Sequence, residues 1–155
     1  MSYRIPDEPR PGALARVAVN PVWPLFALMV GGTWLSWTWF VVNGFALGSP
    51  NRFRELFLAI AGLFGSGALL LGLSVLLDQG FLPQGSAPYL LTILLVWKIG
   101  ISYMLHIWQG RSFSLFEYYG GQVDGRLPFV VLALGWYLRP LLLGDLPIFF
   151  QGLLA

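Results

Sequence analysis

Long apolar stretches joined by short connections dominate this chain. They cover residues 22–47, 50–77, 88–109 and 127–143. An α-helix needs about 20 apolar residues to cross the roughly 30 Å hydrocarbon core of a bilayer, and the first three stretches exceed that length. The fourth is shorter, and Arg139 and Pro140 interrupt it. We therefore predict an all-α integral membrane protein, a bundle of four transmembrane helices that forms one domain over residues 21–155.

The composition agrees with a lipid environment. Only 10% of the 155 residues are charged, whereas soluble domains carry about 25%. Aromatic residues make up 16% and include seven Trp, and such side chains collect at the two lipid–water interfaces. The net charge of +2 and the lack of a basic run argue against nucleic acid as a partner. The expected surroundings are the lipid bilayer.

Both ends of the chain differ from the apolar stretches. Residues 1–20 hold three arginines, two acidic residues and three prolines, which predicts a polar tail. Near the other end, Pro140 bends a helix and residues 144–147 have the composition of a turn. One kinked helix to the last residue is an alternative, but we favour a span that ends near Leu143 and a short interfacial tail.

The arginines do not orient a four-span bundle. One face would hold Arg4, Arg10, Arg16 and, by one count, Arg139, and the opposite face would hold Arg52, Arg54, Arg111 and Arg126. Three or four arginines on one face against four on the other favour neither orientation by the positive-inside rule. The first helix usually dominates, however, and three arginines precede it, which favours a cytoplasmic N-terminus.

Lys98 lies near the middle of the third apolar stretch and is the only lysine in the chain. A cation at the centre of a bilayer costs about 2.5–3.5 kcal/mol, so it needs a partner, a wet cavity or a function. Ser102 and His106 follow at i+4 and i+8, on the same helix face. This polar line is typical of a proton relay or an ion pathway. A structural role, in which Lys98 reaches a headgroup or the carbonyls of a broken neighbouring helix, stays open.

The acidic residues offer few partners for Lys98. No carboxylate is predicted at its depth, with the exception of Asp145 if the C-terminal segment folds back into the bundle. We hypothesise that Asp145 pairs with Arg139 or with Lys98 and so holds the tail. An acidic group on another subunit is a further alternative. The candidate intramembrane polar site comprises Lys98, Ser102, His106, Arg139 and Asp145.

The second apolar stretch is rich in small residues. Ala61 with Gly65, and Ala68 with Gly72, fit the small-xxx-small pattern that lets helix backbones approach closely in a bilayer. These four are our candidate helix-packing residues. Packing within one bundle, self-association and docking on a larger subunit all remain open.

Enzyme signatures are missing from the sequence. Without Cys and with one His, it offers no thiolate site, no His-rich metal site and no bis-His haem site. A nucleophile elbow and a phosphate-binding fingerprint are absent too. We predict no catalytic, cofactor or metal residue and expect a non-enzymatic packing or accessory subunit of a membrane assembly, formed with itself or another membrane subunit. The alternative is a small oligomeric channel or proton- or ion-translocating unit that uses Lys98, Ser102 and His106.

Overall fold

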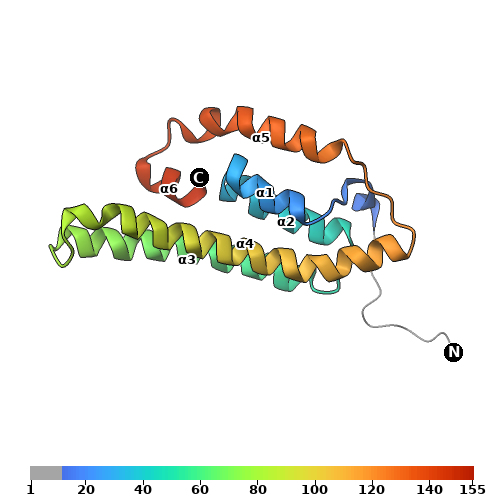
Figure 1. Ribbon diagram of the computed structural model, residues 1–155, viewed down its shortest axis with the longest axis horizontal. Coiled ribbons are helices and arrows are strands. Elements are labelled where there is room, and N and C mark those ends of the chain that lie inside the picture. The colour runs from blue at the N-terminus through green and yellow to red at the C-terminus, as the bar shows by residue number, and fades with distance from the viewer. Residues whose placement is uncertain (1–11) are drawn as a thin grey trace.

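The computed structural model describes residues 12–155, and its regular secondary structure is entirely helical over that range (Figure 1). The helices are α1 (Val22–Val30), α2 (Thr33–Ala46), α3 (Arg52–Asp78), α4 (Ala87–Tyr118), α5 (Leu127–Leu143) and α6 (Ile148–Leu154), with short 3-10 turns η1 (Ala13–Val17) and η2 (Gln84–Ser86). The predicted all-α class is confirmed for the described residues. Residues 1–11 of the predicted polar tail lie outside them.

The predicted first span, residues 22–47, is wrong: it is two short helices folded back on each other. Gly32 adopts φ 93° and ψ −170°, a backbone conformation essentially confined to glycine, and this residue turns the chain. A Cβ there would also lie 2.6 Å from the carbonyl carbon of Ala155. Across the hairpin, Ser36 Oγ donates to Pro24 O at 2.8 Å. The α1–α2 hairpin therefore begins and ends at the same end of the bundle.

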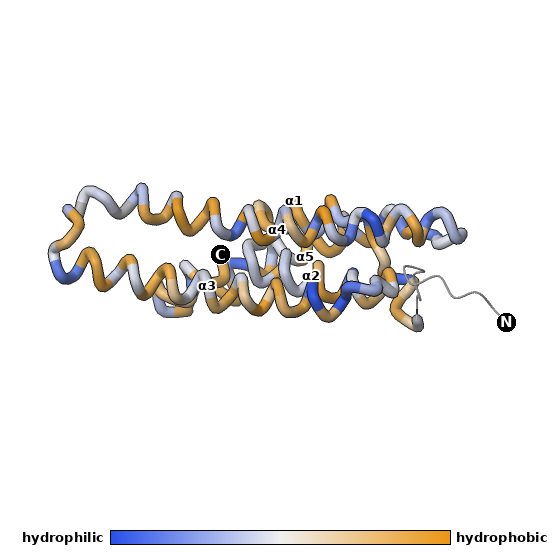
Figure 2. The backbone as a smooth tube through the Cα atoms, turned by 90° about the horizontal axis from the view of Figure 1, so that it is seen from below, coloured by the Kyte–Doolittle hydropathy of each residue, from blue (hydrophilic) through white to orange (hydrophobic). Residues whose placement is uncertain are grey.

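Helices α3 and α4 form a long antiparallel pair (Figures 1 and 2). They contain 27 and 32 residues, or about 40 and 48 Å at 1.5 Å per residue. Small residues bring them together: a Cβ on Gly62 would meet Ile101 at 2.8 Å, and one on Gly65 would overlap the Trp97 ring. Trp97 Nε1 donates to Gly62 O at 3.1 Å, which fixes the pairing.

Both α3 and α4 are long and apolar enough to cross a membrane, judged by length and composition. Little of their apolar surface is covered. Of the most apolar 18-residue segment, 17% is buried in α3 and 33% in α4. Figure 2 shows hydrophobic residues along most of both helices and hydrophilic ones at the turn that joins them. These helices correspond to the predicted spans 50–77 and 88–109, although α4 continues to Tyr118.

The last two helices form a second reversal. Helix α5 has the predicted bounds, 127–143, and carries Pro140 in its last turn. The segment after it differs from the predicted interfacial tail: α6 turns back into the bundle, where a Cβ on Gly152 would lie 3.4 Å from Leu70 of α3. The end of α6 also meets the tip of the α1–α2 hairpin, because Ala155 lies against Gly32.

The connections η1–α1, α2–α3 and α4–α5 gather at one end of the bundle, and the α3–α4 connection lies at the other. A cluster of Ala18, Ala46, Leu47, Phe113 and Phe116 holds η1, the end of α2 and the last turns of α4 together. Helix α5 starts nearby, since Leu127 packs against the cluster of Val19, Ala27 and Trp39. We call this the η1 end. The turn between α3 and α4, with η2, lies at the opposite end, which we call the η2 end (Figure 1).

Candidate functional site

The polar line of α4 does not act as one connected group. Lys98 bonds to α6, Ser102 Oγ accepts a hydrogen bond from Trp37 Nε1 at 2.8 Å, and the His106 ring stacks on Tyr103. His106 Nδ1 is buried and has no hydrogen-bond partner among residues 12–155. No hydrogen bond within these residues links Lys98 to Ser102 or Ser102 to His106. Two of the three predicted residues therefore connect α4 to different neighbouring helices.

Lys98 caps the end of α6. Its side chain is 5% exposed, and Nζ donates to Gly152 O and Ala155 O at 2.7 Å each. Thr33 Oγ1 donates to the carbonyl between them, Leu153 O, at 2.9 Å. The last carbonyls of a helix have no partner in their own helix and carry partial negative charge, so a cation there is favourable. Among the described residues, the partners of Lys98 are main-chain carbonyls, as one alternative expected, but they belong to the end of a short helix and not to a break within one.

Arg139 caps the end of α1 as Lys98 caps the end of α6. Its Nη1 donates to Val30 O, the last carbonyl of α1, at 3.3 Å. Asp145 is exposed in the turn between α5 and α6. Within residues 12–155, the hydrogen bonds of Lys98 and Arg139 go to main-chain carbonyls, so the predicted pairing with Asp145 is not seen. The two cations in apolar segments each satisfy a helix that stops inside the bundle.

A second buried polar cluster lies toward the η1 end, and we call it the Glu55 network. Glu55 is fully buried and accepts from Ser49 Oγ at 2.6 Å and from Gln109 Nε2 at 2.8 Å. Gln109 Nε2 also donates to Phe40 O at 2.5 Å, and Ser112 Oγ donates to Ser49 Oγ at 3.1 Å. Both carboxyl oxygens of Glu55 are thus satisfied without a cation.

Asn43 extends the Glu55 network to the base of the hairpin. Its Nδ2 donates to Gln109 Oε1 and to Val19 O, both at 3.0 Å, and its Oδ1 accepts from Val19 N at 2.8 Å. One side chain therefore ties the segment before α1 to α2 and to α4. Buried amides that meet all these partners specify a unique arrangement of helices.

Sequence reasoning missed the Glu55 network. Glu55 and Gln109 belong to different predicted spans, and only the antiparallel register of α3 and α4 brings them together. In the sequence, Asn43 is one weakly polar residue within an apolar stretch. The missed signal is the position of the two residues. Glu55 lies near the beginning of the second apolar stretch and Gln109 at the end of the third, and one turn joins these stretches at their other ends.

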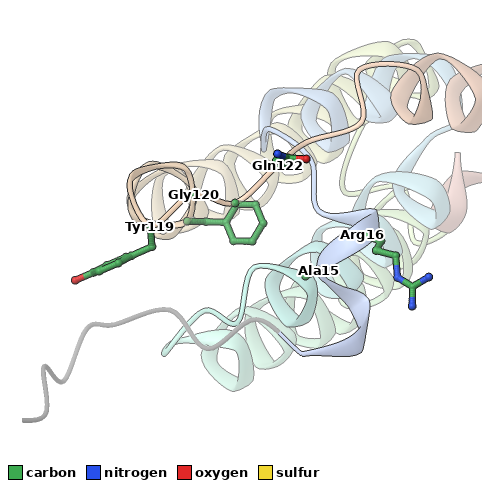
Figure 3. Close-up of a pocket in the computed structure, with 7 residues that line it drawn as sticks. Ala15, Arg16, Tyr119, Gly120 and Gln122 are labelled. Atoms are coloured by element: carbon green, nitrogen blue, oxygen red, sulfur yellow. The ribbon is translucent and has the colours of Figure 1, made fainter. Parts of the chain in front are cut away.

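Cavities open on the surface formed by residues 12–155, and three of them have polar or aromatic linings that bear on function. One of about 330 Å³ lies at the η1 end, where Arg16 and Tyr119 point away from each other (Figure 3). A groove of about 370 Å³ between α2 and α3 is mainly apolar, and Trp34, whose Nε1 has no partner in the described part of the chain, lines it. The third, about 430 Å³, contains Arg54 and Arg111. None of the three includes Lys98, Ser102 or His106.

Residues 12–155 contain no group of three or more His, Cys, Asp or Glu side chains that could hold a metal ion. The chain matches no protein-family model, no curated protein and no solved structure. In the described residues, the buried polar groups connect helices to one another.

Proposed function

We propose that this chain is a multi-pass integral membrane protein and a non-enzymatic packing or accessory subunit of a membrane assembly, formed with further copies of itself or with another membrane subunit. An outward line of small residues on α3 carries the proposal. Ala61, Ala68 and Gly72 are exposed and, at i, i+7 and i+11, lie on one helix face. Gly65, at i+4, lies close to the same line, but the Trp97 side chain of α4 covers it. Small residues on an outer face suit close approach of another helix.

The surroundings of this line support a membrane placement. Phe57 and Phe64, beside it on α3, are 71% and 74% exposed. Contiguous apolar surface of this kind is rare on soluble monomers. Past Leu70, which contacts α6, the α3–α4 pair extends beyond α1, α2 and α5 (Figure 1). A Cβ on Gly72 would have nothing within 4 Å, so the far half of α3 has room for a neighbour.

Crosslinking tests the assembly. The chain has no cysteine, so Ala68→Cys and Gly72→Cys each give one attachment point for a benzophenone maleimide in native membranes. We expect protein adducts from both, because a packed helix lies within reach of a small-residue face. Val96→Cys, an exposed position on α4, is the control. Adducts with lipid alone at both α3 positions would contradict the proposal.

The hairpin also changes how the arginines are distributed between the two faces, and it leaves the expected orientation the same. Because α1 and α2 return the chain to the η1 end, Arg16, Arg52, Arg54, Arg111 and Arg126 all belong to that end. Residues 78–87, at the η2 end, contain no Lys or Arg. The balance that four spans left even becomes five against none within the described residues when Arg139, which lies inside α5 and bonds to Val30 O, is left out of the count. The positive-inside rule then supports a cytoplasmic η1 end, with residues 12–20 on that side.

Cysteine accessibility tests this topology. In intact cells, a membrane-impermeant maleimide should label Gln79→Cys and leave Gly12→Cys and Pro50→Cys unlabelled; in inverted vesicles the pattern should reverse. All three residues are exposed. Residues 12 and 50 are the sharp comparison, since a continuous first span puts them on opposite faces and the hairpin puts them on one. Labelling of these two from opposite sides would refute the hairpin topology.

The alternative function, a channel or ion-translocating unit that uses Lys98, Ser102 and His106, draws less support from the geometry. Lys98 and Ser102 form their hydrogen bonds with α6 and Trp37. A relay needs neighbouring groups that exchange protons, and these groups are bonded to separate helices. The contacts support anchoring over conduction.

A further inference from the structure

The cavity of about 430 Å³ lies between the start of α3 and the later turns of α4. Arg54 and Arg111 line it, together with Asn51, Ser112, Trp108 and Ile107. Both arginines are exposed, and Ser112 is buried in the wall, where it donates to Ser49. The cavity thus combines two cationic forks with hydroxyl, amide and aromatic groups.

The charge in this cavity is uncompensated. None of its lining residues is acidic. Glu55, next to Arg54 in the chain, is fully buried and both of its oxygens accept from Ser49 and Gln109. Within residues 12–155 neither Arg54 nor Arg111 has a hydrogen bond or an ion pair, whereas Arg52 lies over the rings of Phe45 and Phe53 at 5.5 and 5.3 Å. Two like charges in one cavity favour an anion between them.

We propose that this cavity binds a phosphate group, and that the group belongs to the headgroup of an anionic phospholipid. The guanidinium forks of Arg54 and Arg111 match phosphate oxygens in bidentate geometry. The first turn of α3, which begins at Arg52, adds the positive end of its helix dipole. This proposal goes beyond the proposed assembly function and rests only on its membrane placement.

The position of the cavity favours a lipid as the source. Trp108 is a residue type that collects at the headgroup level. Ile107 lines the cavity, and Met104 and Tyr103 continue from it along α4 as exposed side chains. A lipid with its phosphate between the arginines can lay an acyl chain along this strip. A free phosphate ester would use the arginines but leave the strip uncovered.

Lipid titration of the purified full-length protein in detergent tests the site. The readout is native mass spectrometry, with phosphatidylglycerol, phosphatidylcholine and inorganic phosphate as probes. We expect wild type to bind phosphatidylglycerol about tenfold or more tightly than Arg54→Gln/Arg111→Gln does, since each arginine near a membrane surface contributes on the order of 1 kcal/mol. Arg126→Gln removes one exposed arginine from the same end and should bind like wild type.

The controls separate the outcomes. Arg54→Lys/Arg111→Lys keeps the charge and should bind with intermediate affinity, because an ammonium lacks the fork. Equal phosphatidylglycerol affinity of wild type and the double Gln variant would overturn the site, as would an equal loss in Arg126→Gln. Phosphate that competes at millimolar concentration, with no preference for phosphatidylglycerol over phosphatidylcholine, would support a phosphate site and overturn the lipid source. None of these results depends on whether the chain crosslinks to another subunit.

Discussion

Replacing Lys98 by leucine is expected to release α6 from the bundle. The variant leaves Gly152 O and Ala155 O without their donor in apolar surroundings, and each unsatisfied carbonyl costs about 1–3 kcal/mol. The substitution also removes the cost of burying a cation, so global stability changes less than the docking of α6. We expect hydrogen-exchange protection of the α6 amides to fall by about 2 kcal/mol or more, roughly 30-fold.

A neighbour on the same helix provides the control for Lys98→Leu. His106→Leu lies two turns further along α4 and removes no hydrogen bond to α6. Its α6 amides should keep wild-type protection. If both variants loosen α6 equally, or if neither does, the cap does not hold the helix. Exchange measured in α3 reports separately on whether the bundle remains folded.

Gln109→Leu is expected to destabilise the whole bundle. This variant deprives three buried groups of a partner: Glu55 Oε2, Phe40 O and Asn43 Nδ2. Asn43 retains Val19 O, and Phe40 O keeps its place in the hydrogen bonds of α2, so Glu55 Oε2 is the group left without a partner. An unsatisfied buried group costs about 1–3 kcal/mol and a carboxylate costs more, so we expect a loss of about 3 kcal/mol, measured by denaturant unfolding in detergent. Gln122→Leu, at an exposed loop position, should be nearly neutral.

A double-mutant cycle makes this prediction specific. Glu55→Leu alone takes one partner each from Ser49 Oγ and Gln109 Nε2, while Glu55→Leu with Gln109→Leu removes donor and acceptor together. Replacing both members of a hydrogen-bonded pair by apolar groups costs less than leaving one unsatisfied. The double variant should therefore lose less stability than the sum of the single losses. Additive losses would show that the two side chains do not depend on each other.

Hydropathy predicted α3 and also α5, which Arg139 and Pro140 interrupt, and it failed where two helices share one apolar run. The bounds of α5 and most of α3 follow from apolar length. The Gly31–Gly32 break does not, because glycine is common inside spans and mean hydropathy carries no information on φ. Only the contacts of Gly32 with Leu154 and Ala155 show why the chain turns there.

For the polar residues, too, the sequence pattern does not predict contacts between distant segments. Lys98 stands out by composition, and its place in an apolar stretch already points to the carbonyls of a broken helix as one kind of partner. Which carbonyls these are depends on α6 folding back, a long-range event that no local pattern encodes. The Glu55–Gln109 pair needs the register of α3 against α4. Single residues can thus be marked from sequence, whereas their pairing requires the tertiary structure.

The meeting of the α1–α2 hairpin with α6 sets an order of events during synthesis. Thr33 Oγ1 bonds to Leu153 O, 120 residues later in the chain. At about 5–20 residues per second, a ribosome needs roughly 6–24 seconds to make that interval. Throughout that time the hairpin tip is already made, while the helix that completes it does not yet exist. The earliest helices to leave the ribosome are therefore among the last to reach their final contacts.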